Sequence, residues 1–281
     1  YDDTINEIVA LHRERCFYIK SDTACINQLK AYARMCMGWA EEDDSKAKDE
    51  IKKAAGELVT LAKQGKDVSD YDPRLTSVIE TTFDVRGPMN AAREHIEKQT
   101  VKLVQSLPVW TEWAKDIKGV GAASVGTIIG ECGSFANYAN PGKVWKRMGL
   151  APYEGRAYST WRMKGGLNAE QWTEAGYSPK RRSWAFNLGE PIVKTPGSIY
   201  RDVYLERKAV EHEKCKADGL IPAATTRTTV DSWAKLKLDL SKVTAIDYAK
   251  HRSAGHMEKR ARRYMEKRVL RDMWRAWRDT M

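Results

Sequence analysis

Apolar positions recur every three to four residues along most of the chain, a spacing typical of amphipathic helices. The pattern over residues 5–39 predicts a long helix with a break near residues 21–22. Further patterns predict a helix over residues 45–66 that is capped by Ser45, and another over residues 89–107. The first hundred residues therefore predict antiparallel helices or a coiled coil, which would serve for packing or dimerisation.

The same periodicity continues towards the C-terminus. Residues 199–216 predict a charged helix, and residues 256–278 predict an amphipathic helix with one strongly basic face. We therefore expect a mainly α-helical protein with two parts. Residues 1–107 would form a helical, coiled-coil-like scaffold, and residues 108–281 would form a domain that contains a helix-hairpin-helix.

Charge is divided unevenly between these parts. Residues 1–100 carry 15 Lys and Arg against 19 Asp and Glu, whereas residues 101–281 carry 33 against 19. Basic residues gathered in one part of a chain whose isoelectric point is about 9.3 are typical of proteins that bind polyanions. Nucleic acid, with a binding affinity that falls as salt rises, is the partner that this distribution favours.

The remaining composition excludes several classes of protein. The five cysteines contain no C-x-x-C pair, and the histidines show no metal-binding spacing, so we expect neither a disulfide framework nor a metal or other cofactor. No segment has the pattern of a membrane span or a signal peptide. These features indicate a cytoplasmic, nucleoid-associated protein.

A Gly-x-Gly turn lies between two apolar segments with helical spacing, at residues 117–126. Glycine allows the backbone to approach a ligand closely, and the helix that follows begins with unpaired N–H groups and the positive end of its dipole. A dinucleotide-binding fingerprint is excluded, because no strand precedes the turn and its third glycine is replaced by Ser124. The turn predicts a phosphate cradle, with tight interhelical packing as the alternative. Its candidate residues are Lys118, Gly119, Val120, Gly121, Ala122 and Ser124.

A basic helix start at Ser178 supplies further candidates. Ser178 suits the N-cap and Pro179 the first turn, but Lys180, Arg181 and Arg182 then place positive charge at the positive end of the helix dipole. A bound phosphate would resolve this conflict. Trp184, one turn on, would stack on an unpaired base or, as the simpler interpretation, fill the core.

Several of these segments, in the same order, resemble the C-terminal domain of the IS110/IS116/IS902 transposases. The family's glycine hairpin, the stretch after it, its "GLAP" block, its basic helix and its closing helix correspond to residues 117–121, 130–135, 141–152, 176–185 and 256–278. The resemblance covers most of the chain, apart from residues 156–173 and 219–251. It implies DNA as a partner, structured RNA as a further one, and a homodimer or higher oligomer through the N-terminal helices.

The resemblance also implies particular residues. Lys143, Lys146 and Arg147 lie in the matched "GLAP" segment as candidates for phosphate contact. The family's serine nucleophile would correspond to Ser159, with Arg156 and Arg162 as phosphate ligands. The resolvase-like domain with four acidic residues that precedes this domain in the family is not seen here.

Three functions remain open from the sequence. A DNA-binding protein needs only the cationic surface, and it is slightly favoured. A transposase or recombinase that performs strand exchange, with or without an RNA guide, needs Ser159 or an acidic domain. A basic helix with tryptophans near its end also suits a membrane-surface or structural interaction protein.

Overall fold

The computed structural model describes residues 1–41, 44–66, 68, 73–155, 168–219, 221–223 and 251–280. These residues are mainly α-helical, which confirms the predicted fold class. The chain divides into two compact units. We call Ala10–Thr100 the N-terminal unit, and we call Tyr1–Val9 together with Val101–Met281 the C-terminal unit.

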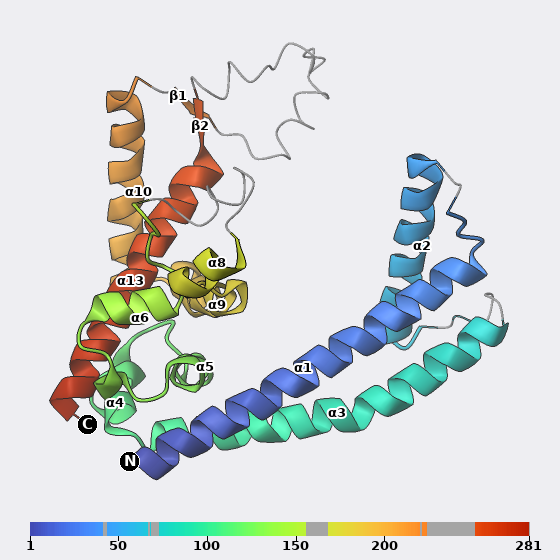
Figure 1. Cartoon of the computed structure of the whole chain (residues 1–281), viewed down its shortest axis with the longest axis horizontal. Coiled ribbons are helices and arrows are strands. Elements are labelled where there is room, and N and C mark those ends of the chain that lie inside the picture. Colours follow the sequence, from blue (N-terminus) through green and yellow to red (C-terminus); the bar gives the residue numbers. More distant parts are fainter. Residues whose placement is uncertain are drawn as a thin grey trace. The chain divides into compact units, whose positions relative to one another are not determined.

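Long helices form the N-terminal unit (Figure 1). Most of α1 (Asp2–Cys36), α2 (Ser45–Lys63) and most of α3 (Pro73–Gln105) belong to it. Helices α1 and α3 run antiparallel, because Arg15 pairs with Glu97 at 2.7 Å while Arg86 pairs with Asp22 at 2.5 Å.

The predicted break in α1 is wrong, since the helix is continuous through residues 21–22. Asp22 does not cap a new helix; its carboxylate accepts a hydrogen bond from Arg86 of α3. The α3 prediction also started too late, because Gly87 and Pro88 lie inside a helix that begins at Pro73. Proline lacks the N–H that closes a helical turn, yet α3 continues through this position, next to the Arg86–Asp22 pair that joins it to α1.

Helix α2 begins where the sequence predicted and ends at Lys63. Its N-cap is Asp44 rather than Ser45, and the Asp44 carboxylate accepts a hydrogen bond of 2.8 Å from the Ala47 N–H. The unit's core comes from all three helices: Ile26, Leu29, Ala33, Ala55, Leu58, Val59, Leu75 and Ile79. Met35, also on α1, is 70% exposed.

We predict that Leu29→Ala lowers the free energy of unfolding of the N-terminal unit by about 2–5 kcal/mol, because it removes buried methyl groups and leaves a cavity. Met35→Ala on the same helix is the control and should stay within about 0.5 kcal/mol of the wild type. Urea denaturation followed by far-ultraviolet circular dichroism measures both. Equal losses of stability in the two variants would contradict the placement of Leu29 in the core.

The C-terminal unit consists of shorter elements around one long helix (Figure 1). In chain order they are α4 (Pro108–Thr111), η1 (Ala114–Asp116), α5 (Ala122–Cys132), η2 (Phe135–Asn137), α6 (Pro141–Arg147), α8 (Ala169–Ala175), α9 (Pro179–Lys194), α10 (Ile199–Ala217), β1 (Ile221–Ala223), β2 (His251–Ser253) and α13 (Ala254–Thr280). Strands β1 and β2 pair in parallel, with Ile221 opposite His251.

Helix α13 is the centre of this unit and packs against α4, α6, α9 and α10. Of the apolar side that the sequence pattern predicted, Met265, Val269, Met273 and Trp277 are buried, whereas Tyr264 and Trp274 are half-buried. Met257, Ala261 and Leu270 are buried with them. The Trp277 ring stacks on Phe135 at 5.3 Å between centroids. The Trp145 indole N–H donates to the Lys267 carbonyl at 3.0 Å, so α6 is fastened to α13.

Within the described part of the chain, no helix is both long enough and apolar enough to cross a membrane. Both tryptophans of α13 make contacts inside the C-terminal unit. Trp277 is buried, and the half-buried Trp274 donates its indole N–H to the Tyr138 carbonyl at 2.8 Å.

Candidate nucleic-acid interface

The glycine turn lies directly before α5, as predicted, but the segment before it is not one regular helix. It consists of α4 and the single 3-10 turn η1, separated by Glu112 and Trp113, and the Trp113 φ of −136° is not helical. Val120 and Ala122 are buried in the core of the unit, and Ser124 is half-buried. The backbone of the turn, rather than these side chains, is therefore the part that a ligand can reach.

Gly119 is required by packing. Its φ is +88°, a conformation that L-residues rarely adopt, and a Cβ placed on it would lie 2.8 Å from the Ile192 Cα of α9. The alternative of tight interhelical packing therefore accounts for this glycine.

Gly121 differs from Gly119 in both respects. It is exposed, its φ is −99°, and a Cβ placed on it would meet no described atom within 4 Å. It is the N-cap of α5, where its carbonyl accepts from the N–H groups of Ser124 and Val125, and it offers no side chain to cap the first turn. The earliest N–H groups of α5 thus keep the open, anion-attracting arrangement of an uncapped helix start.

Helices α5 and α9 pack in opposite directions. Gly119, just before α5, approaches Ile192 near the end of α9, while Glu131 near the end of α5 pairs with Arg181 at the start of α9. At 1.5 Å per residue, the two ends of α5 are about 15 Å apart. The glycine turn and the basic start of α9, both predicted phosphate ligands, therefore lie at opposite ends of the α5 and α9 pair.

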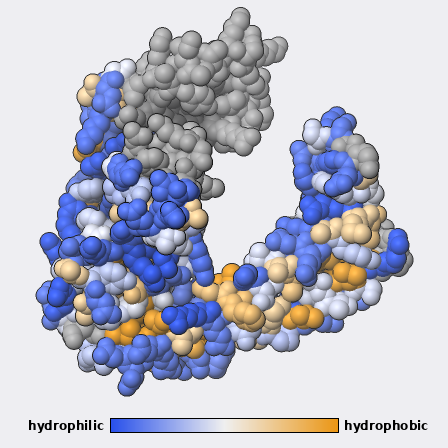
Figure 2. Space-filling model, in the orientation of Figure 1, coloured by the Kyte–Doolittle hydropathy of each residue, from blue (hydrophilic) through white to orange (hydrophobic). Residues whose placement is uncertain are grey.

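A cationic groove of about 430 Å³ lies at the α9 start. We call it the α6 groove; its lining residues are Asn137, Tyr138, Ala139, Lys143, Lys146, Arg147, Gly176 and Arg181. Four of them are basic and none is acidic. Lys143 and Lys146 are exposed, and within the described ranges neither ammonium lies at ion-pair distance from a carboxylate. Figure 2 shows that the face of the molecule it displays is mostly hydrophilic over the C-terminal helices.

Glu131 fixes the two arginines of this groove. Arg147 donates to its backbone carbonyl at 2.9 Å, and Arg181 pairs with its carboxylate at 3.3 Å. The neighbouring Cys132 is unsuited to nucleophilic chemistry, because burial raises the pKa of its thiol to about 12. Burial likewise raises the pKa of Tyr138 to about 12, and its hydroxyl donates to the Cys132 carbonyl.

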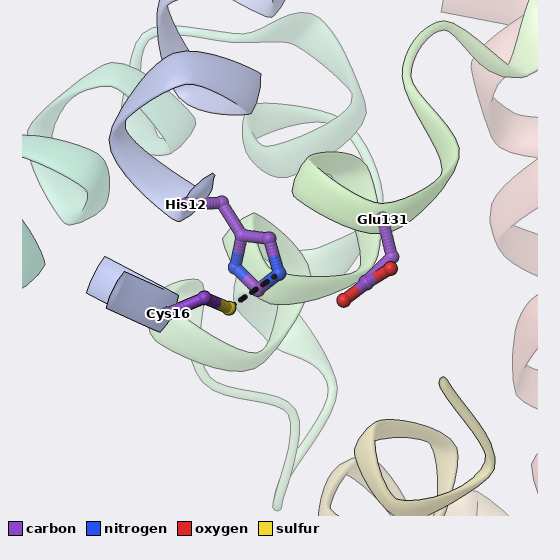
Figure 3. A group of neighbouring side chains, drawn as sticks. All are labelled: His12, Cys16 and Glu131. Atoms are coloured by element: carbon purple, nitrogen blue, oxygen red, sulfur yellow. Dashed lines mark hydrogen bonds between the residues drawn. The ribbon is translucent and has the colours of Figure 1, made fainter. Parts of the chain in front are cut away.

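Figure 3 draws Glu131 together with His12 and Cys16, which belong to the N-terminal unit. His12 and Cys16 lie one turn apart on α1, with Cys16 Sγ and His12 Nε2 3.5 Å from each other. This hydrogen bond forms within one helix.

Carboxylates within the protein compensate the positive charge at the start of α9. Ser178 is the N-cap, as predicted, and its hydroxyl accepts from the Arg181 N–H at 3.4 Å. Arg181 pairs with Glu131, and Arg182 pairs at 2.9 Å with Glu266 of α13. The conflict with the helix dipole is thus relieved without a phosphate.

Glu266 is a residue that the sequence analysis missed. Its side chain is fully buried and also lies 3.4 Å from Arg262. Burial raises its pKa to about 7, against the opposite effect of Arg182 and Arg262. In the sequence it is one glutamate among the basic residues of α13, so only the tertiary contact with α9 reveals its role.

The other candidates are placed as follows. Lys180 is exposed. The Lys118 ammonium lies near Gly197, since a Cβ placed on Gly197 would be 3.4 Å from Lys118 Nζ. Trp184 is half-buried and packs against the core, which agrees with the simpler of its two interpretations. Arg156, Ser159 and Arg162 lie outside the described residues.

Comparisons with known proteins gave no match, whether to a family model, a curated protein or a solved structure. The resemblance to the IS110-type transposases therefore stays a prediction from sequence motifs.

We predict that Gly119→Ala and Gly121→Ala differ in their effect on stability. Gly119→Ala should cost about 2 kcal/mol or more, because it combines an unfavourable φ with overlap on the Ile192 backbone. Gly121→Ala should cost about 1 kcal/mol or less, the difference between these residues at an N-cap. Thermal denaturation of both variants measures this, and a larger loss in Gly121→Ala would refute the assignment.

Proposed function

We propose that this chain is a nucleic-acid-binding protein that contacts the phosphate backbone of duplex DNA through the C-terminal unit. The observation that carries the proposal is the α6 groove, whose lining residues include four basic ones and no acidic one, with Arg181 alone of the four paired to a carboxylate in the described structure. Cations that lack internal carboxylate partners are the groups that gain most from a phosphate, since binding also releases counterions from the nucleic acid.

The start of α5 would supply a second contact. Backbone N–H groups and an uncapped helix start hold phosphates without reading bases, and lysines act on phosphates as point charges. The distance of about 15 Å along α5 allows the two contacts to engage different phosphates of one backbone. Such binding would depend strongly on salt and only weakly on base sequence.

This proposal leaves room for the transposase-like function that the sequence motifs imply. Strand exchange would require a covalent or strand-transfer step in addition to binding. A binding protein would produce no new DNA species, so products on a denaturing gel distinguish the two functions.

We predict that Lys143→Gln combined with Lys146→Gln weakens binding to a labelled duplex. The slope of log affinity against log salt should become shallower by about 1–2, because each neutralised phosphate contributes about 0.9. Fluorescence anisotropy across a salt series measures both quantities. Lys52→Gln combined with Lys53→Gln on the exposed surface of α2 removes the same charge elsewhere and is the matched control.

Equal losses in the two double variants would mean that net charge, not the groove, governs binding, and would contradict the proposal. Structured RNA of the same length, used as a competitor, decides which nucleic acid is preferred. Each sample is then run on a denaturing gel, where cleavage or a protein-linked strand would restore the recombinase interpretation. That product should disappear in Ser159→Ala.

A second binding prediction concerns the start of α5. Gly121→Val should weaken duplex binding more than Gly121→Ala, because its branched side chain covers the first N–H groups of the helix. Both variants have open space at this position, so circular dichroism should show an intact fold. Identical affinities for wild type, Gly121→Ala and Gly121→Val would show that the glycine turn does not contact the nucleic acid.

A further inference from the structure

A second cationic cavity, of about 540 Å³, lies in the C-terminal unit and shares no lining residue with the α6 groove. We call it the arginine pocket. Its cationic residues come from three helices, α9, α10 and α13: Arg182, Arg207, Arg260, Arg263 and Lys267. Glu211 is the one carboxylate among its lining residues.

Two fully buried carboxylates hold most of these arginines in place. Glu211 of α10 pairs with Arg207, and its other oxygen lies 2.6 Å from Arg260 of α13. Glu266 holds Arg182 in the same way. A guanidinium has five N–H donors in a fixed fork, so one carboxylate partner positions it and leaves further donors for a ligand.

Arg263 and Lys267 are cations of a different kind. Arg263 donates to the Lys259 carbonyl, and the Lys267 ammonium lies 5.3 Å from the Trp145 ring centre. In the described part of the chain neither forms an ion pair with a carboxylate. Burial lowers the pKa of both, and the nearby Arg182 lowers it further, while Glu266 and Glu211 act in the opposite direction on the pKa of Arg263.

Residues 149–152 and Tyr177 also line the pocket. Gly149 has a φ of +68°, and a Cβ placed on it would lie 3.1 Å from Tyr177 and 3.3 Å from the Arg182 Cβ. Glycine at this position therefore lets the backbone approach Tyr177 and Arg182 closely. The cavity is within the usual size range of small-ligand sites, about 300–1,000 Å³.

We propose that the arginine pocket binds a phosphate group with more charge than a backbone diester, namely a terminal phosphate monoester or a polyphosphate chain. A diester brings one negative charge, whereas the five cationic side chains exceed by three the two carboxylates that pair with them, Glu211 and Glu266. Converging guanidinium forks suit the several oxygens of such a group. This chemistry occurs at the 5′-phosphate end of nucleic acid and in free nucleoside triphosphates, and it does not depend on the duplex contact proposed above.

The test measures binding of inorganic triphosphate to the full chain by isothermal titration calorimetry. Arg263→Gln combined with Lys267→Gln removes two pocket cations that hold no internal carboxylate. It should weaken triphosphate binding about tenfold or more. Lys52→Gln combined with Lys53→Gln removes the same charge from the exposed surface of α2 and should leave triphosphate affinity unchanged. Arg263→Gln alone, with an expected loss of about fivefold, serves if the double variant is unfolded by circular dichroism.

Two further titrations identify the source of the phosphate. A single-stranded oligonucleotide with a 5′-phosphate that binds more tightly than its 5′-hydroxyl counterpart indicates a nucleic-acid end, whereas ATP that competes without such a preference indicates a free nucleotide. Undetectable triphosphate binding to the wild type, or equal binding to the pocket variant, would overturn the proposal. Duplex binding is scored separately, so failure of the pocket is distinguishable from failure of the α6 groove.

Discussion

The C-terminal unit depends on two fully buried carboxylates, Glu211 and Glu266. Taking a charged group out of water costs several kcal/mol unless partners surround it, and each of these carboxylates has two arginines near it. The pairs cross between helices: Glu266 of α13 holds Arg182 of α9, and Glu211 of α10 holds Arg260 of α13. The same contacts that align the three helices therefore also decide which cationic groups face solvent and in which orientation.

This arrangement changes the meaning of the basic residues. By sequence, Arg181 and Arg182 are free cations at the start of a helix, where only an anion would relieve them. In the structure Glu131 and Glu266 already do so, and a phosphate would compete with carboxylates that are fixed nearby. The cations best suited to an external phosphate are those without such partners in the described structure, Lys143 and Lys146 in one place and Arg263 and Lys267 in another. The number of basic residues is therefore a weaker indication of phosphate binding than whether each one already pairs with a carboxylate of the protein.

Local periodicity predicted much of the fold. Helix α10 begins at the expected Ile199, and α13 buries most of the expected apolar face, because both patterns are set by residues within the same helix. The errors arose where a distant residue overrides a local signal. Asp22 lies at the predicted break but is held by Arg86 of α3. Pro88, directly before the predicted start of the third helix, lies inside α3. Glu266 was missed for the same reason, since its partner Arg182 is 84 residues away.

The glycine turn shows the same limit at the candidate site. Gly119 and Gly121 belong to the same Gly-x-Gly motif and look alike in the sequence. They differ in the structure because only Gly119 lies against Ile192 of α9. Packing fully explains Gly119, so it is no evidence for a ligand. Gly121 faces open space and has an ordinary φ, so no steric demand explains it. Ser, Asn or Asp would cap α5 at least as well, but their side chains would occupy the N–H groups that glycine leaves open. The absence of a capping side chain at Gly121, rather than the Gly-x-Gly spacing itself, is therefore the feature that favours an external anion.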